Sequence, residues 1–271
     1  MWSVYLKAEL PSDAFLISRL RPAVALADAN IPCIVWGEEA LAWIHGVPTY
    51  TFNTLHLLVP ETQIELASNT LTRVLPEYAP NDPRTNYPFP DWLFAPREKE
   101  KFQALGRFPY ASPLTVRLSH TRLASAIDHP SVRRNISTLD HIVLTPDSFF
   151  HLSATDTTSL VSLPSLTPPS LSAVRFSSLP TMYDALFSTI SAPERSEYST
   201  GLGQDLDIYL GYLHLYYFSE YVKGWYKELK DLPEPIREVS LALRAENQPR
   251  FWEMWLKDEP FEDASDDESD W

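Results

Sequence analysis

Several features that would narrow the function of this chain are scarce in its sequence, and the first is cysteine. A single cysteine, Cys33, occurs among the 271 residues, so the chain cannot form an intramolecular disulfide. This composition is typical of a reducing compartment. Cys33 lies in an apolar segment, where a cysteine usually behaves as a small buried hydrophobic residue rather than as a nucleophile. We therefore expect an intracellular protein.

Basic residues are also scarce. The chain has 22 Lys and Arg against 36 Asp and Glu, which gives a net charge of −14 and a pI near 4.9. An acidic chain repels phosphate groups unless it gathers its basic residues on one face, and here those residues are scattered. We therefore expect no nucleic-acid partner.

The sequence lacks a long apolar run. Its first ten residues, MWSVYLKAEL, show no apolar stretch after a basic start, so we expect no secretory signal. The most apolar later window, 208–218, is too short to span a bilayer and is rich in tyrosine. These features predict a soluble, cytoplasmic protein with no membrane partner.

Two common catalytic and cofactor motifs are missing as well. The chain has no G-x-S-x-G motif, so an α/β-hydrolase finds no support. The segment GLG at 201–203 lacks the third glycine and the preceding strand of a dinucleotide-binding motif. The histidines in the middle of the chain follow no common period, which favours surface or capping roles: His120, His129, His141 and His151.

What is present is enough apolar surface for a globular core. Hydrophobic residues make up 44% of the chain and aromatic residues 13%, which excludes a disordered protein. Apolar spacing in the first half predicts alternating helices and strands. The predicted helices cover 11–29, the segment from 38 to 45 and the segment after Pro60; the predicted strands cover 31–36, 52–59, 114–118 and 139–144.

The second half of the chain is predicted to contain a connector and helices rather than alternating helices and strands. Residues 153–178 are rich in Ser, Thr, Leu and Pro, which predicts a connector across the surface and a domain boundary. Helices are expected at 180–190, 204–230, 236–245 and 250–256, with the second of them the longest. We therefore divide the chain into an α/β domain at 1–152, the connector, a helical region at 179–256 and a disordered acidic tail at 257–271.

A segment rich in proline and aromatic residues interrupts the first half at 76–113. Prolines and aromatic side chains break every regular pattern there, as in YAPNDPRTNYPFPDWLFAP. A loop this long in a compact domain is usually a lid, a binding loop or an insertion. A small-molecule pocket beneath it is a further possibility.

The segment 31–59, IPCIVWGEEALAWIHGVPTYTFNTLHLLV, resembles the opening of the nucleotidyltransferase fold. In that family a strand runs into a Gly-Gly or Gly-Ser turn, followed by a short helix, a loop and a second strand that carries an Asp-x-Asp pair. Ile34-Val35-Trp36-Gly37 and Leu55-His56-Leu57-Leu58-Val59 are similar to these two strands. The resemblance covers about residues 31–75 and implies a small mixed sheet, so we expect an α/β fold with a C-terminal helical layer.

The family's chemistry is not matched by these residues. The resemblance implies two carboxylates on one strand face that hold two Mg²⁺ ions, and their positions here are Thr54 and His56. Neither is an anionic oxygen ligand, which Mg²⁺ prefers. The phosphate-binding turn is Gly37-Glu38, and a carboxylate there would repel a phosphate. If the site is active, we expect Glu38, His56 and Asp140 to carry the reaction, with Mg²⁺ or Mn²⁺ and a nucleotide near Gly37.

Glu38, Glu39, His45 and His56 are also a candidate transition-metal or general-base site, because we expect them to converge near the carboxyl ends of the two strands, where open α/β sheets bind ligands. No two of these residues show a recognised metal-ligand spacing, however. The alternative is that the glutamates are first-turn helix residues, favoured there by the helix dipole, and that the histidines line the strand edge. We favour this second interpretation and expect no bound metal.

Aromatic residues gather near the C-terminus, and they are either core or a protein-binding surface. Trp and Tyr are frequent at interface hot spots, and an acidic tail would steer a basic partner toward them. The candidate partner-binding residues are Trp225, Trp252 and Trp255, beside Tyr226 and Phe251.

Two functional hypotheses follow. The first is a non-catalytic protein of nucleotidyltransferase-like fold, which acts as a protein-interaction or scaffold module through its C-terminal region. The second is a divergent nucleotidyltransferase or nucleotide-binding protein that uses the cleft around Gly37, Glu38 and His56.

Overall fold

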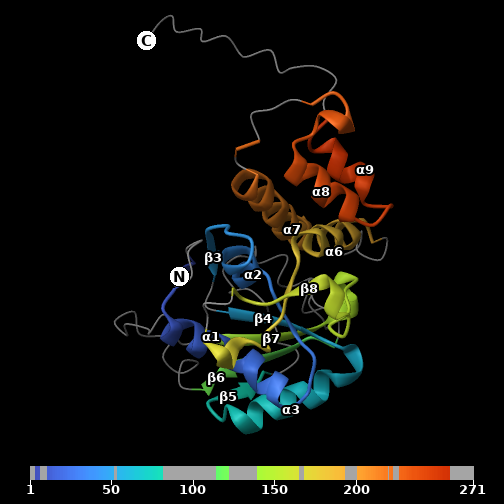
Figure 1. The fold of residues 1–271 in the computed structure, drawn as a ribbon. Helices are drawn as coiled ribbons and strands as arrows, with labels where there is room; N and C mark the ends of the chain where they lie inside the picture. The colour runs from blue at the N-terminus through green and yellow to red at the C-terminus, as the bar shows by residue number, and fades with distance from the viewer. Residues whose placement is uncertain are drawn as a thin grey trace, which may run out of the picture.

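The structure is a computed structural model, shown in Figure 1. It describes residues 4–6, 11–51, 54–81, 114–121, 139–164, 168–192, 200–218, 220–221 and 226–256. Most of the 76–113 segment, the acidic tail and Trp225 therefore lie outside the described residues.

A mixed sheet organises the first part of the chain. Its seven strands run in the order β5-β6-β7-β4-β2-β9-β8. The strands are β2 (Ile34–Trp36), β4 (Thr54–Val59), β5 (Tyr78–Pro80), β6 (Val116–His120), β7 (His141–Pro146), β8 (Leu160–Val161) and β9 (Phe176–Ser177). The pairs β4–β7 and β2–β9 are parallel, and the other neighbours are antiparallel. A separate antiparallel pair joins β1 (Val4–Leu6) and β3 (Thr49–Thr51). The predicted α/β fold with a small mixed sheet is confirmed.

The central strands are buried on both faces, so their side chains divide between two cores. On β4, Leu57 packs in one hydrophobic cluster and Leu58 in the other, because successive side chains of a strand point to opposite faces. On β2, Val35 belongs to the first cluster and Trp36 to the second. This explains why these strands read as continuous apolar runs rather than as alternating ones.

Helices α1 (Asp13–Asp28) and α3 (Ile64–Val74) cover the first face. Helix α1 buries Leu16, Leu20, Ala23 and Leu26, which recur every three or four residues as expected for one helical face. Helix α3 begins after a 3-10 turn at Glu61–Gln63 and buries Ile64, Ala67 and Leu71. Both helices were predicted close to these bounds.

The helical layer packs on the second core. It consists of α6 (Leu179–Ser191), α7 (Thr200–Tyr212) with a π-helical turn at Leu213–Tyr217, α8 (Glu234–Ala242) and α9 (Gln248–Glu253). Its centre is aromatic: the Tyr183 ring lies 5.1 Å from the Phe251 ring, and Phe218 lies 5.3 Å from Trp255. In Figure 1 these helices form the orange and red upper part of the molecule, above the sheet.

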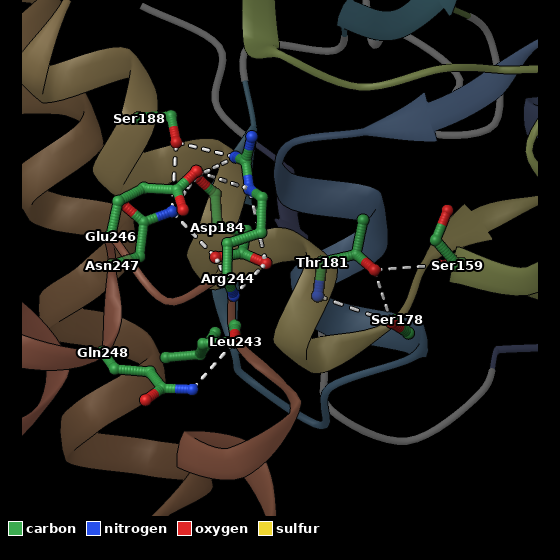
Figure 2. Close-up of polar contacts among 10 residues, drawn as sticks. All are labelled: Ser159, Ser178, Thr181, Asp184, Ser188, Leu243, Arg244, Glu246, Asn247 and Gln248. Carbon is green, nitrogen blue, oxygen red and sulfur yellow. Dashed lines mark hydrogen bonds and ion pairs between the residues drawn. The ribbon is translucent and has the colours of Figure 1, made fainter.

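Asp184 ties α6 to the turn between α8 and α9 (Figure 2). Its carboxylate accepts hydrogen bonds from the backbone N–H of Arg244, at 3.1 and 3.2 Å, and from Nδ2 of Asn247 at 2.8 Å. The Arg244 guanidinium and Asn247 also donate to the Ser188 hydroxyl, at 2.7 and 3.1 Å. One buried acid therefore satisfies backbone and side-chain donors of a turn about 60 residues away.

The predicted secondary structure is wrong for two segments. The predicted surface connector at 153–178 holds β8 and β9, and Phe176 of β9 is fully buried where it pairs with Val35 of β2. The predicted helix at 204–230 ends at Tyr217, because the π-helical turn interrupts it and Phe218 turns into the aromatic core. The predicted helices at 180–190, 236–245 and 250–256 are confirmed, with bounds shifted by up to three residues.

Candidate functional site

The candidate site lies where β2 runs into the short helix α2 (Glu38–Trp43). Gly37 makes this turn with a φ of 72°, a left-handed conformation that favours glycine. A Cβ atom at Gly37 would lie 3.4 Å from the Tyr209 hydroxyl and 3.8 Å from Cδ2 of His56. The space above the turn is therefore occupied by Tyr209 of α7 and by His56 of β4.

Glu38 is buried in this turn. Burial raises the pKa of its carboxyl, while hydrogen bonds from its own backbone and from the Tyr209 hydroxyl, and the charge of Arg19, act in the opposite direction. Tyr209 thus contacts the turn twice, once over Gly37 and once at Glu38. The predicted site residues Gly37, Glu38 and His56 are brought together, and Tyr209 joins them from a helix far along the chain.

Glu39 points into a different environment from Glu38. Its Oε1 accepts from Nε and Nη2 of Arg19 at 3.1 and 2.5 Å, and both side chains are fully buried. Burial raises the pKa of Glu39, and the Arg19 charge opposes this shift. The pair links α1 to α2, so Glu39 is a structural residue of a buried ion pair rather than a solvated first-turn acid.

Four neighbouring strands contribute one cross-strand row of side chains, next to the β2–α2 turn at Gly37. Trp36, His56, Val143 and Arg117 are directly opposite one another on β2, β4, β7 and β6. Burial lowers the pKa of His56 to about 4; the Glu39 charge opposes this shift and the Arg117 charge adds to it. His56 is therefore neutral at physiological pH.

The next row of the same face is also polar. Thr54, His141 and Ser119 are opposite one another, and the Ser119 hydroxyl lies 2.9 Å from Nδ1 of His141. We call these two rows the polar floor, and its members are Thr54, His56, Arg117, Ser119 and His141. Hydroxyl, imidazole and guanidinium groups make up its polar chemistry, and the described positions of the floor include no carboxylate.

The structure associates Asp140 with the opposite face. Along β7, His141 and Val143 lie on the polar floor side, and Ile142 and Leu144 pack in the first core. Asp140 precedes the strand, and its charge helps raise the pKa of Tyr78, a residue of that first core. The prediction that Asp140 supports Glu38 and His56 is therefore not favoured by this arrangement.

His45 interacts with β9, whereas His56 lies on β4. His45 follows α2, is buried, and interacts with the backbone of Ser177 on β9, which partly opposes the lowering of its pKa by burial to about 4. Among the described residues, no group of three or more His, Cys, Asp and Glu could hold a metal ion. Cys33 is buried, and burial raises the pKa of its thiol to about 12, which removes nucleophilic character.

The two predicted partner-binding tryptophans that the structure describes, Trp252 and Trp255, differ in how deeply they are buried. Trp255 is 2% exposed and packs on Phe218 and His214, so a partner could not contact it without opening the core. Trp252 is half-buried and donates from Nε1 to the Ser240 hydroxyl at 2.6 Å. The prediction that Trp255 binds a partner is therefore corrected: Trp255 is a core residue, because the chain after α9 directs it toward the aromatic centre.

Three residues near the site were missed by the sequence analysis: Arg19, Arg117 and Tyr209. Arg19 had a detectable signal, since it is a charged residue between the buried Leu16 and Leu20 of one helical face. Arg117 also had one, because it alternates with the apolar Val116 and Leu118 of a predicted strand. Tyr209 had none, because only the packing of α7 against the turn places it there.

No family model, curated protein or solved structure matches this chain. Within the described part of the chain, no helix is both long enough and apolar enough to cross a bilayer.

Proposed function

We propose that this chain is a non-catalytic protein with a nucleotidyltransferase-like core that acts as a protein-interaction or scaffold module. The observation that carries the proposal is the filled β2–α2 turn. A phosphate approaches such a turn through open backbone N–H groups at a helix start. Here the Tyr209 hydroxyl lies over Gly37 and donates a hydrogen bond to the buried carboxylate of Glu38.

The strand positions support the same proposal. Two-metal nucleotidyl transfer needs carboxylates at alternate positions of one strand, so that both share a face. Thr54 and His56 occupy the corresponding alternate positions of β4, and both lie on the polar floor. A hydroxyl and a neutral imidazole are poor ligands for Mg²⁺.

A divergent nucleotide binder is the second candidate, and Arg117 is the observation that favours it. Arg117 lies in the same row as His56, and a buried cation on the polar floor would attract an anionic ligand. In that case Gly37, Glu38 and His56 would line the ligand, and Mg²⁺ or Mn²⁺ would accompany it. Tyr209 would first have to leave the turn.

A thermal-shift screen separates the two candidates. Pure protein is heated with Mg²⁺ or Mn²⁺, alone and with each of the four nucleoside triphosphates. A ligand at 100 times its dissociation constant stabilises a protein by about 2.7 kcal/mol, which such a screen detects readily. We expect no shift with any nucleotide, for the native chain and for Glu38→Ala alike, because the turn is occupied from within the chain.

The screen includes Tyr209→Ala, which opens the turn, and His151→Asn, a control at an exposed histidine outside the site. A metal-dependent nucleotide shift in the native protein that is lost in His56→Ala and kept in His151→Asn would overturn the proposal. A shift that occurs only in Tyr209→Ala would instead support it, since the native side chain then closes a latent site.

A further inference from the structure

Helix α7 and the π-helical turn that follows it carry an exposed apolar patch, in which Tyr212 alone also packs against the second core. Ten large hydrophobic residues are exposed in the described chain, and four of them lie within 208–217: Ile208, Leu215, Tyr216 and Tyr217. Such clustering differs from the single exposed apolar residues that are normal on protein surfaces. Leu215 is 56% exposed, and Ile208 and Tyr216 are each 47% exposed.

The spacing aligns these residues on one side of the helix. Ile208, Tyr212 and Tyr216 recur every four residues, and Leu215 follows Ile208 by seven, so all four share a face. The Tyr212 and Tyr216 rings are in T-shaped contact, 5.9 Å apart. We call Ile208, Tyr212, Leu215 and Tyr216 the α7 patch. The opposite side of the helix is buried through Leu206, Leu210 and Leu213.

The π-helical turn carries two of the four patch residues, Leu215 and Tyr216. Three successive residues, 215–217, are exposed in this turn, whereas Leu213 before them and Phe218 after them are fully buried. Single π-helical turns inside α-helices occur frequently at functional sites. Tyr residues at a rigid surface also supply large contact area at low entropic cost.

The charge around the patch indicates its partner. Residues 200–218 include two aspartates and no lysine or arginine. Asp207 directly precedes Ile208 and Glu220 follows the π-helical turn in the sequence; both are exposed, and the whole chain has a net charge of −14. A second copy of this chain would bring like charges together, and a membrane-binding helix would carry Lys and Arg instead of acids.

We infer that the α7 patch docks a basic amphipathic helix of a partner protein, with apolar residues against the patch and Lys or Arg toward Asp207 and Glu220. A helix that docks in this way contacts its partner through side chains spaced by three, four and seven residues. The residues of the α7 patch are related by the same spacings. The inference rests on the proposed scaffold function and names the surface and the chemical class of its partner.

A synthetic peptide tests this inference on the full chain. The probe is a labelled helix of about 18 residues built from Leu, Ala and Lys, with Leu on one face. A scrambled peptide of the same composition and a peptide with Glu in place of Lys are the controls, and binding is measured by fluorescence anisotropy. We expect the native protein to bind the amphipathic Lys peptide and neither control peptide.

The protein variants are Leu215→Asp and Tyr216→Asp, with Leu241→Asp as the matched control. Leu241 is 73% exposed on α8, so the control adds the same charge at another exposed apolar side chain. We expect each patch variant to weaken binding about tenfold or more and Leu241→Asp to leave it within about twofold. Equal thermal unfolding midpoints for all three variants confirm that they fold.

Several results would overturn the inference: no binding of the amphipathic peptide, equal binding of the scrambled peptide, or equal losses in Leu215→Asp and Leu241→Asp. A dimer in sedimentation velocity that Leu215→Asp dissociates would assign the patch to a second copy. Binding to phosphatidylserine vesicles that Leu215→Asp abolishes would assign it to a membrane. A nucleotide-dependent thermal shift, by contrast, would refute the proposed function and leave the peptide result unchanged.

Discussion

At the scale of single residues, the neighbours Glu38 and Glu39 show how burial separates two identical side chains. Glu39 is neutralised by Arg19 of α1, whereas Glu38 is held by the Tyr209 hydroxyl of α7. A buried carboxylate is stable only with such partners. Because both residues stand at a helix start, the sequence predicted the same first-turn role for each. In the structure Glu39 pairs with α1 and Glu38 with α7, so their roles differ.

The pH dependence of stability follows from His45, which is buried and has a pKa of about 4 in the folded chain against an ordinary value of 6.5. Above pH 6.5 the ring is neutral in both states, and its contribution to stability is complete. As the pH falls below 6.5 the unfolded chain takes up a proton that the folded chain excludes. The His45 contribution to the free energy of unfolding should then fall by about 1.4 kcal/mol per pH unit, down to about pH 4. His56, whose pKa burial also lowers to about 4, adds a similar fall in the native chain and in the His45 variant alike.

Urea unfolding of the native chain and of His45→Asn at pH 7, 6 and 5 measures this contribution. The difference between the two free energies of unfolding should shrink as the pH falls, because the variant lacks the titrating ring. His151→Asn is the control and should keep the native slope, since His151 is exposed and its left-handed φ of 55° suits asparagine. Parallel pH curves for the native chain and His45→Asn would contradict the prediction.

At the scale of elements, β9 is a strand of the sheet that the composition of its segment did not predict. It lies in a stretch rich in Ser, Thr and Pro, yet it pairs with β2 on one side and β8 on the other. Leu171, Val174 and Phe176 of this stretch are buried at 1% exposure or less. A short strand needs only a few apolar residues when its neighbours already form the sheet.

Replacing Phe176 by alanine tests the role of β9. Phe176 is fully buried in the first core, so the cavity left by Phe176→Ala should lower the free energy of unfolding by about 3–5 kcal/mol. Ser172→Ala, at an exposed position of the same stretch, should change it by no more than about 0.5 kcal/mol. Urea unfolding measures both. A small effect of Phe176→Ala would restore the interpretation of 153–178 as a surface connector.

At the scale of the whole molecule, the α/β part and the helical layer share a core. The second hydrophobic cluster includes Trp36 and Leu58 of the sheet together with Tyr183 and Phe251 of the helices. Tyr209 adds a polar contact at the β2–α2 turn. Parts that share a core in this way are expected to unfold together, although the composition of the chain predicts two domains.

Hydrogen exchange in Asp184→Ala tests this cooperativity. The substitution removes a carboxylate that three hydrogen bonds hold within the helical layer, and should cost about 3 kcal/mol. If the parts unfold together, the slowest amides of β4 and β7 should lose the same free energy of protection as those of α6. Asp28→Ala, at an exposed helix end, is the control. Unchanged protection in β4 would show two independent domains.

The fold could be predicted in large part because local patterns determine it. The spacing of Leu16, Leu20 and Ile64, Ala67, Leu71 predicted two helices, and the apolar runs around Val35 and Leu57 predicted two central strands. The candidate site was predicted only in part. Gly37, Glu38 and His56 come together within one short segment, whereas Arg117 and Tyr209 come from strands and helices that only long-range packing places beside them.

By itself, therefore, the sequence determined the α/β class, the helices α1, α2 and α3, the strands β2 and β4, and the absence of an Asp-x-Asp pair on β4. The strands β3 and β5 were not predicted. These features depend on neighbours within a few residues, whose side-chain period and backbone preference are local. Only the tertiary structure decided that Tyr209 fills the Gly37 turn, that Trp255 is buried and that the α7 patch is exposed. Burial depends on which distant elements pack together, and residue spacing does not encode that choice.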